Sequence, residues 1–134
     1  MGLVTPNGVG TEASWESLLN GQSGVGPITS FESEAYPCRI AAEVKGFDPA
    51  QFIAKRKLKE MCRFTQFALS ATKMAVESSG LVLSDEEKLR TGCFIGVGLG
   101  GLENLERVTL LLHEKGPGKV SPYFIPSIIG NLAA

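Results

Sequence analysis

Glycine and proline divide this chain into short segments. Sixteen glycines and seven prolines are spread over its 134 residues, and either residue generally interrupts a helix or strand when it falls in the interior. The longest stretch free of both that also carries a helical pattern runs from residue 61 to 79. The chain is therefore expected to fold as short elements joined by many backbone turns.

The pattern over residues 61–79 predicts the most secure helix. Met61, Phe64, Ala68, Ala71, Ala75 and Ser78 recur with a period near 3.6 residues, and Gly80 follows as a stop. Because the second half of this face carries only small side chains, we expect it to pack closely against another element.

Shorter elements follow from local signals. Thr11 can cap a helix over residues 12–20, on which Trp15, Leu18 and Leu19 share a face, and Asp48-Pro49 starts a short helix to residue 53. Ser84 and Glu87 match a capping box for a helix that ends near residue 90. Further helices are expected over 103–114 and from Pro126 onward, with an edge strand at 39–44 and a buried strand at 91–98.

Composition excludes several classes of protein. A net charge of −1 indicates no nucleic-acid partner, and no apolar run reaches the roughly 18 residues of a membrane span. No secretory segment is recognised at the start of the chain, and Cys38, Cys62 and Cys93 form an odd, widely spaced set. These observations predict reduced thiols and a cytoplasmic location.

No catalytic or metal-binding constellation can be assembled from the residues. Cys93 is expected on the buried strand and Cys62 on the long helix, both as core side chains, and the single His113 is expected at a helix surface. The glycines from 96 to 101 resemble a phosphate-binding loop only imperfectly, so a tight structural turn is favoured. We therefore predict no cofactor and no metal.

The basic run Lys55-Arg-Lys-Leu-Lys59 has two interpretations. The first is an ordinary solvated face. The second is a docking patch for an acidic partner, because clustered charge speeds encounter and sets orientation.

Four landmark segments, taken in order, resemble one family. They are Gly2-Leu-Val-Thr-Pro-Asn-Gly8, Trp15-Glu-Ser-Leu-Leu-Asn-Gly-Gln-Ser-Gly24, Gly96-Val-Gly-Leu-Gly-Gly101 and Ser121-Pro-Tyr-Phe-Ile-Pro126, followed by Asn131. Their order and spacing are similar to the β-ketoacyl-acyl-carrier-protein synthase II family, the elongating condensing enzymes of the thiolase-like group. The resemblance extends over essentially the whole chain.

This resemblance implies an α/β fold of the thiolase-like type, in which residues 1–134 are part of the N-terminal half. It implies that the first strand and the C-terminal half are missing, so that the domain is truncated at both ends. Family members are homodimeric acyltransferases that condense an acyl thioester with malonyl-acyl carrier protein. Their catalytic Cys, His and Lys residues match nothing in this chain, so the chain alone is expected to be inactive.

The resemblance also assigns roles to individual residues. Leu99 and Phe124 match positions that line the acyl-chain pocket, the latter reaching the neighbouring subunit. Arg56, Lys59 and Lys119 match basic positions that meet the acidic helix of acyl carrier protein, whereas Glu60 and Gly118 depart from the family's basic residues. Two alternatives stay open: a non-catalytic module that binds acyl carrier protein or pairs with a synthase, and a small nucleotide-binding domain.

Overall fold

The computed structural model describes residues 1–134 and divides into two compact units. The first comprises Met1–Asp48 and Ala71–Gly80, and the second comprises Pro49–Ser70 and Leu81–Ala134. The longest helix, α3 (Arg63–Ser79), contributes its first part to the second unit and the remainder to the first. It confirms the helix predicted over residues 61–79, and Gly80 ends it with φ of 65°.

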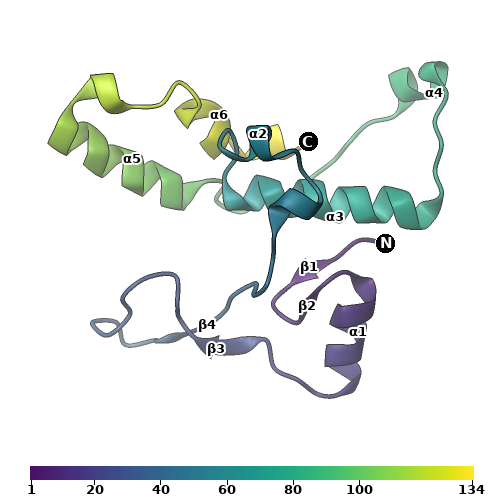
Figure 1. Cartoon of the computed structure of the whole chain (residues 1–134), viewed down its shortest axis with the longest axis horizontal. Coiled ribbons are helices and arrows are strands. Elements are labelled where there is room, and N and C mark those ends of the chain that lie inside the picture. The colour runs from purple at the N-terminus through teal and green to yellow at the C-terminus, as the bar shows by residue number, and fades with distance from the viewer. The chain divides into compact units, whose positions relative to one another are not determined.

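Four short strands in the first unit form two antiparallel hairpins (Figure 1). β1 (Val4–Thr5) pairs with β2 (Gly8–Val9), and β3 (Val25–Pro27) pairs with β4 (Ile40–Ala42). The strand expected at 39–44 is confirmed as β4. Because an isolated two-stranded hairpin is marginally stable, contacts with other segments must support each pair.

Helix α1 (Thr11–Leu19) packs against the first hairpin through serine side chains rather than through its apolar face. Ser14 and Ser17 are buried, and their hydroxyls lie 3.1 Å from Thr5 Oγ1 and 3.0 Å from Asn7 Nδ2. Trp15 on the other face is 60% exposed. Polar groups that bond to one another replace an apolar core at this contact.

The capping role predicted for Thr11 is wrong. Thr11 is the first helical residue, and its hydroxyl donates to the Met1 carbonyl at 3.3 Å. Gly10 takes the N-cap position with φ of 97°, a left-handed conformation that glycine adopts without steric cost.

The small-residue face of α3 is confirmed as a site of close packing. A Cβ added to Gly2 would lie 2.0 Å from the Ala71 carbonyl oxygen and 2.6 Å from the Ala75 nitrogen. The terminal amino group of Met1 also donates to Ser78 Oγ at 3.2 Å. Gly2 can approach the backbone of α3 because it has no side chain and because Ala71 and Ala75 carry only a methyl group.

The second unit is built from helices and helical turns. Its α-helices besides the first part of α3 are α2 (Lys55–Leu58), α4 (Asp85–Arg90), α5 (Leu102–Lys115) and α6 (Phe124–Ile128). Its 3₁₀ turns are η1 (Pro49–Gln51), η2 (Pro117–Lys119) and η3 (Gly130–Ala133). Helix α5 packs against α6 and η2, and α2 packs against η1.

Several predicted helices are confirmed in this unit. The segment at 48–53 forms the single turn η1, and α5 covers the expected 103–114. Helix α4 carries the complete capping box: Ser84 Oγ accepts from the Glu87 N–H at 3.3 Å, and the Glu87 carboxylate accepts from the Ser84 N–H at 2.8 Å. The Ser84 hydroxyl also donates to the Glu87 carboxylate at 2.7 Å. This bond, followed by the one from the Ser84 N–H, favours the charged carboxylate and lowers the pKa of Glu87.

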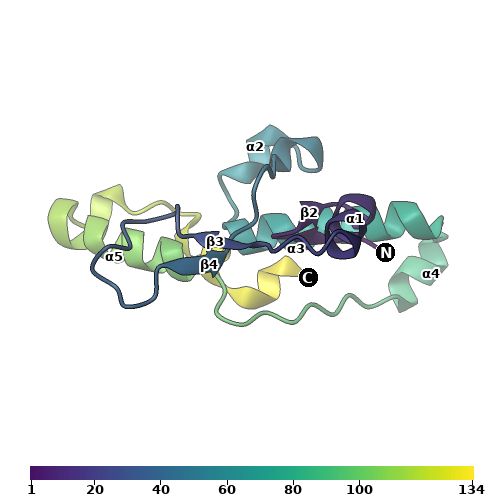
Figure 2. The same cartoon turned by 90° about the horizontal axis from the view of Figure 1, so that it is seen from below.

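The buried strand predicted at residues 91–98 is wrong. Figure 2 shows this stretch as extended coil between α4 and α5, and no strand is assigned there. Phe94 is 97% exposed, and Cys93 is exposed rather than buried. A strand needs a neighbour to bond its backbone, and the four strands of this chain pair only within their own hairpins.

Pro126 does not begin the last helix as predicted. Helix α6 starts two residues earlier, at Phe124. Pro126 is tolerated at its third position because the first N–H groups of a helix have no partner within it.

The apolar core of the chain is small. Only four hydrophobic residues are buried, all in the second unit: Ile53, Cys62, Val108 and Ala133. None of the helices combines the length and the apolar character that crossing a membrane requires.

Candidate functional site

The three basic residues predicted to dock a partner are all exposed. Arg56 lies on α2, Lys59 caps the C-terminus of the same helix, and Lys119 ends η2. Arg56 and Lys59 are three residues apart, which places them on neighbouring positions of one helical turn. The ion pairs of the chain join Lys73 to Glu77 and Lys88 to Asp85, so none of the three takes part in one.

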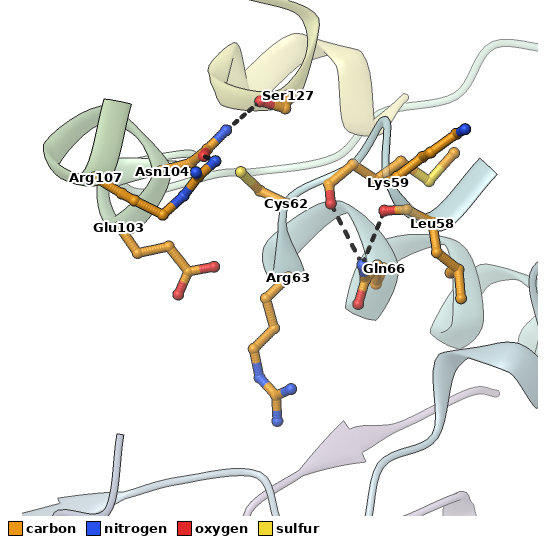
Figure 3. A pocket seen from close by; sticks show the side chains of 10 residues that line it. Leu58, Lys59, Cys62, Arg63, Gln66, Glu103, Asn104, Arg107 and Ser127 are labelled. Carbon is orange, nitrogen blue, oxygen red and sulfur yellow. Dashed lines mark hydrogen bonds between the residues drawn. The ribbon is translucent and has the colours of Figure 1, made fainter. Parts of the chain in front are cut away.

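Lys59 also borders a hollow of about 540 Å³ in the second unit. Its wall includes the basic side chains Lys59, Arg63 and Arg107, the acid Glu103 and the thiol Cys62. Figure 3 shows that the side chains of Lys59 and Arg63 extend away from Cys62. The cations therefore do not converge on one point of this hollow, as an anion site requires.

A group of bonded polar side chains lies in the wall of this hollow (Figure 3). Asn104 Nδ2 donates to Ser127 Oγ at 2.5 Å, and the Ser127 hydroxyl donates to the Phe124 carbonyl at 2.7 Å. Arg107 donates from its guanidinium to Asn104 Oδ1. We call Cys62, Asn104, Arg107 and Ser127 the Asn104 cluster.

Burial raises the pKa of the Cys62 thiol, and hydrogen bonds to Ser127 and Asn104 oppose this only in part. The side chain is 6% exposed. Since the thiolate is the reactive form of cysteine, Cys62 is a poor nucleophile at neutral pH. Its expected role as a core residue is confirmed.

A second, smaller hollow of about 300 Å³ contains Leu99. Phe64, Phe67 and Leu102 supply apolar wall, and Arg63 contributes a guanidinium whose Cζ lies 4.8 Å from the centre of the Phe67 ring. Leu99 is 80% exposed. The hollow has the apolar character that an alkyl chain needs.

Phe124 is half-buried at the start of α6 and lines neither hollow. Leu99 and Phe124 thus lie on two segments of the second unit, the loop before α5 and the helix α6. Their shared role in an acyl pocket stays a prediction.

The glycine loop acts as a tight turn where it meets α6. Gly100 has φ of 67°, and a Cβ there would lie 2.5 Å from the Ile128 carbonyl oxygen. The Gly101 N–H, which stands at the N-terminus of α5, donates to that same oxygen at 3.1 Å. This donor is already used within the chain, which weakens the phosphate-binding interpretation.

Sequence reasoning missed the Asn104 cluster. Asn104 and Ser127 are separated by 23 positions, and each also suits an ordinary place in a helix. No spacing rule connects them, because only the packing of α5 against α6 brings them together.

Comparison with known proteins shows a match over the whole chain. Residues 1–134 match the family described as Beta-ketoacyl synthase, N-terminal domain. The chain is 44% identical over 134 residues to 3-oxoacyl-[acyl-carrier-protein] synthase 2 of Vibrio cholerae, and 39% identical to the protein of that name from Synechocystis. These alignments cover 100% of this chain and 32% of each relative, so the chain spans about a third of their length.

Two solved structures share the fold of this chain. The ishigamide ketosynthase/chain length factor matches with a TM-score of 0.80 and 27% identity, over 98% of this chain and 33% of that one. A type II PKS acyl-carrier protein in complex with its ketosynthase matches with a TM-score of 0.70 and 21% identity, over 98% and 34%. Both likenesses support the predicted α/β, thiolase-like class and its partial N-terminal half.

Proposed function

Because the chain belongs to the β-ketoacyl synthase family, through its N-terminal domain, we propose that it is part of a 3-oxoacyl-acyl-carrier-protein synthase that lengthens fatty acyl chains. The observation that carries this proposal is the match over residues 1–134 to proteins of that name. In the proposed reaction an enzyme thiolate attacks the acyl thioester and releases the thiol that carried the acyl group. Malonyl-acyl carrier protein then loses carbon dioxide, and the resulting enolate attacks the enzyme-bound acyl group and releases the enzyme thiolate.

No residue of this chain is assigned to the chemistry itself. The Cys62 thiol is buried with a raised pKa, and the single His113 is exposed near the end of α5. The chain instead contributes binding surfaces, and the two units are proposed to form part of one N-terminal domain. That the chain alone is inactive stays a prediction.

Leu99 and Phe124 are proposed to line the acyl-chain pocket. The apolar hollow beside Leu99 supports the first assignment, because burying an alkyl chain is favourable by about 0.8 kcal/mol for each methylene. The half-buried ring of Phe124 is compatible with a second wall contributed across a homodimer.

Acyl carrier protein is the proposed partner of Arg56, Lys59 and Lys119. All three are exposed and outside the ion pairs of the chain, so their charge is available to an acidic helix. A cytoplasmic location accompanies this proposal, because the three cysteines are unpaired.

The docking proposal is tested in a hybrid synthase. Residues 1–134 replace the matching third of the Vibrio cholerae protein, and binding of acyl carrier protein is measured by calorimetry at low and high salt. Charge reversal by R56E and K59E together is expected to weaken binding about tenfold or more at low salt, with a smaller loss at high salt.

The matched control reverses the exposed Lys45, which lies in the other unit. K45E is expected to leave the affinity unchanged. Because K45E reverses one charge and the test variant two, a loss of affinity about half as large on a logarithmic scale in K45E would show that net charge alone attracts the carrier protein. No weakening by R56E and K59E would contradict the docking site.

The alternative of a non-catalytic module that binds acyl carrier protein shares the docking site. It is favoured over the synthase if the hybrid binds the carrier protein as expected but yields no ketoacyl product from acyl- and malonyl-loaded carrier protein.

A further inference from the structure

The first unit contains two asparagines that are each followed by a glycine. They are Asn7, before Gly8, and Asn20, before Gly21. An asparagine can lose its side-chain amide when the backbone nitrogen of the next residue attacks the side-chain carbonyl carbon. Glycine leaves that nitrogen open to react, because it has no side chain to hinder the approach. The structure places the two asparagines in different surroundings.

Asn7 is held by hydrogen bonds and by close packing. Its side-chain amide donates to Ser17 Oγ at 3.0 Å and to the Gln22 carbonyl at 2.7 Å. Its backbone N–H donates to Thr5 Oγ1 at 3.2 Å. A Cβ at Gly24 would lie 2.8 Å from Asn7 Oδ1, so the side chain has little free space on that side.

The nitrogen that would attack Asn7 belongs to Gly8, which pairs with Thr5 in the first hairpin. Closing a ring between Asn7 and Gly8 rotates the backbone that joins them and pulls the Asn7 amide away from both of its acceptors. We therefore expect this reaction to require opening of the hairpin.

Asn20 lies at the C-terminal end of α1, where its side chain is exposed and forms no hydrogen bond. Gly21 follows in the left-handed conformation, with φ of 63°. Its N–H donates to the Leu18 carbonyl at 3.1 Å, and the Gln22 N–H donates to the Ser17 carbonyl at 2.9 Å, as in a Schellman motif. Only this last turn must open for the Gly21 nitrogen to reach Asn20 Cγ, and helix ends open readily.

We propose that Asn20 is a site of spontaneous deamidation in the folded chain, whereas the bonds of Asn7 protect the other site. The Gly21 backbone nitrogen forms a bond to Asn20 Cγ, and the bond from Cγ to Nδ2 breaks. The proton of the Gly21 N–H leaves with the amide group as ammonia. Water then opens the cyclic imide at either carbonyl and gives aspartate or isoaspartate, so no oxidant or reductant is consumed. This inference does not depend on the proposed function.

The product changes the end of α1. A carboxylate at residue 20 lies at the negative end of the helix dipole, and the last turn of α1 has no basic residue to offset it. Isoaspartate also lengthens the backbone by a methylene group, which displaces the Gly21 and Gln22 N–H groups from their acceptors on α1. Both products are expected to loosen the loop that supplies the Gln22 carbonyl to Asn7.

The test compares the two asparagines within residues 1–134. The chain is incubated at mildly alkaline pH, where the attacking nitrogen loses its proton more readily. Cleavage after Glu12 and Glu16 then separates Asn7 from Asn20 for mass spectrometry. We expect Asn20 to be converted at least about tenfold faster than Asn7. In guanidinium chloride the two rates should approach each other, because glycine follows both asparagines.

Substitution of Ser17 tests the protection of Asn7. S17A removes one acceptor of the Asn7 amide and is expected to speed conversion of Asn7 without changing that of Asn20. The matched control is S23A, because Ser23 accepts from the Val25 N–H and does not bond to Asn7. S23A is expected to leave both rates unchanged.

Hydrogen exchange measures the effect on α1 without waiting for the reaction. N20D, which imitates one product, is expected to lower the protection of the Gly21 and Gln22 amides, whereas the neutral N20Q should preserve it. Equal conversion of Asn7 and Asn20 in the absence of denaturant, or faster conversion of Asn7, would overturn the inference. So would an Asn20 that stays intact while the denatured chain is converted. Unchanged protection in N20D would overturn the proposed loosening of α1.

Discussion

Gly101 shows how much one missing Cβ matters in this chain. Its φ of −88° suits any residue, so conformational freedom does not explain the glycine. The lack of space around Gly101 explains it, because an added Cβ would lie 2.7 Å from Cys62 Sγ and 2.8 Å from Ile128 Cα. The thiol can turn aside, whereas the backbone of α6 cannot.

Substitution of Gly101 by alanine is therefore expected to destabilise the hybrid synthase by about 1–3 kcal/mol, the usual effect of overpacking. The matched control is G98A, in the same loop, where an added Cβ has nothing within 4 Å and φ is not positive. Urea unfolding of both variants measures the difference. Equal midpoints for G101A and G98A would contradict the close packing of the loop on α6.

Glu43 holds the loop between β3 and β4 in place. Its carboxylate accepts from the Thr29 N–H at 3.0 Å, from the Thr29 hydroxyl at 2.7 Å and from the Ser30 N–H at 3.1 Å. These bonds to the charged form, led by the side-chain bond with Thr29, lower the pKa of Glu43 from 4.5 to about 2. The interaction is exposed, so solvent limits its contribution to stability.

The lowered pKa of Glu43 predicts the pH at which the contact between its carboxylate and residues 29 and 30 is lost. It stabilises the loop at pH values above 4.5 and disappears as the pH falls through about 2. We expect the Thr29 and Ser30 amides of residues 1–134 to stay protected from hydrogen exchange below pH 4.5 and to lose protection only toward pH 2. E43Q, which replaces the charged acceptor with a neutral amide, should lower protection across this range, and loss already near pH 4.5 would contradict the contact.

Across the whole chain, exposed large apolar side chains outnumber the buried hydrophobic residues. Phe94, Val82 and Leu89 are 97%, 89% and 89% exposed, while the buried hydrophobic residues number four. Exposed apolar surface on this scale indicates a surface that other protein covers. The chain spans about a third of its relatives, which agrees with such a role.

Residues 1–134 on their own are expected to unfold gradually on heating, because a small core and two-stranded hairpins support little cooperativity. The hybrid synthase is expected to unfold in a sharp transition at a higher temperature. Scanning calorimetry at low protein concentration checks both. A sharp two-state transition of the isolated monomer would contradict this prediction, because it would show that residues 1–134 fold cooperatively without the rest of the synthase.

Local signals were sufficient for most helices. The α4 capping box, the period of α3 and its stop at Gly80 depend on neighbours within a few residues, so the sequence alone determined them. The order of the glycine, proline and aromatic landmarks likewise indicated the family before any contact was known. The helix signals can be predicted without the tertiary structure because they depend on interactions between residues that are close in the sequence.

The tertiary structure decided what each segment packs against. The pattern at 91–98 has the composition of a buried strand, but strand formation depends on a partner backbone that these residues do not have here. The serine face of α1 and the bond from Asn104 to Ser127 depend in the same way on residues distant along the chain. The sequence alone indicated a glycine loop at residues 96–101. Its contact with α6 follows only from the fold, because hydrogen bonds between distant segments form only when packing brings them within reach.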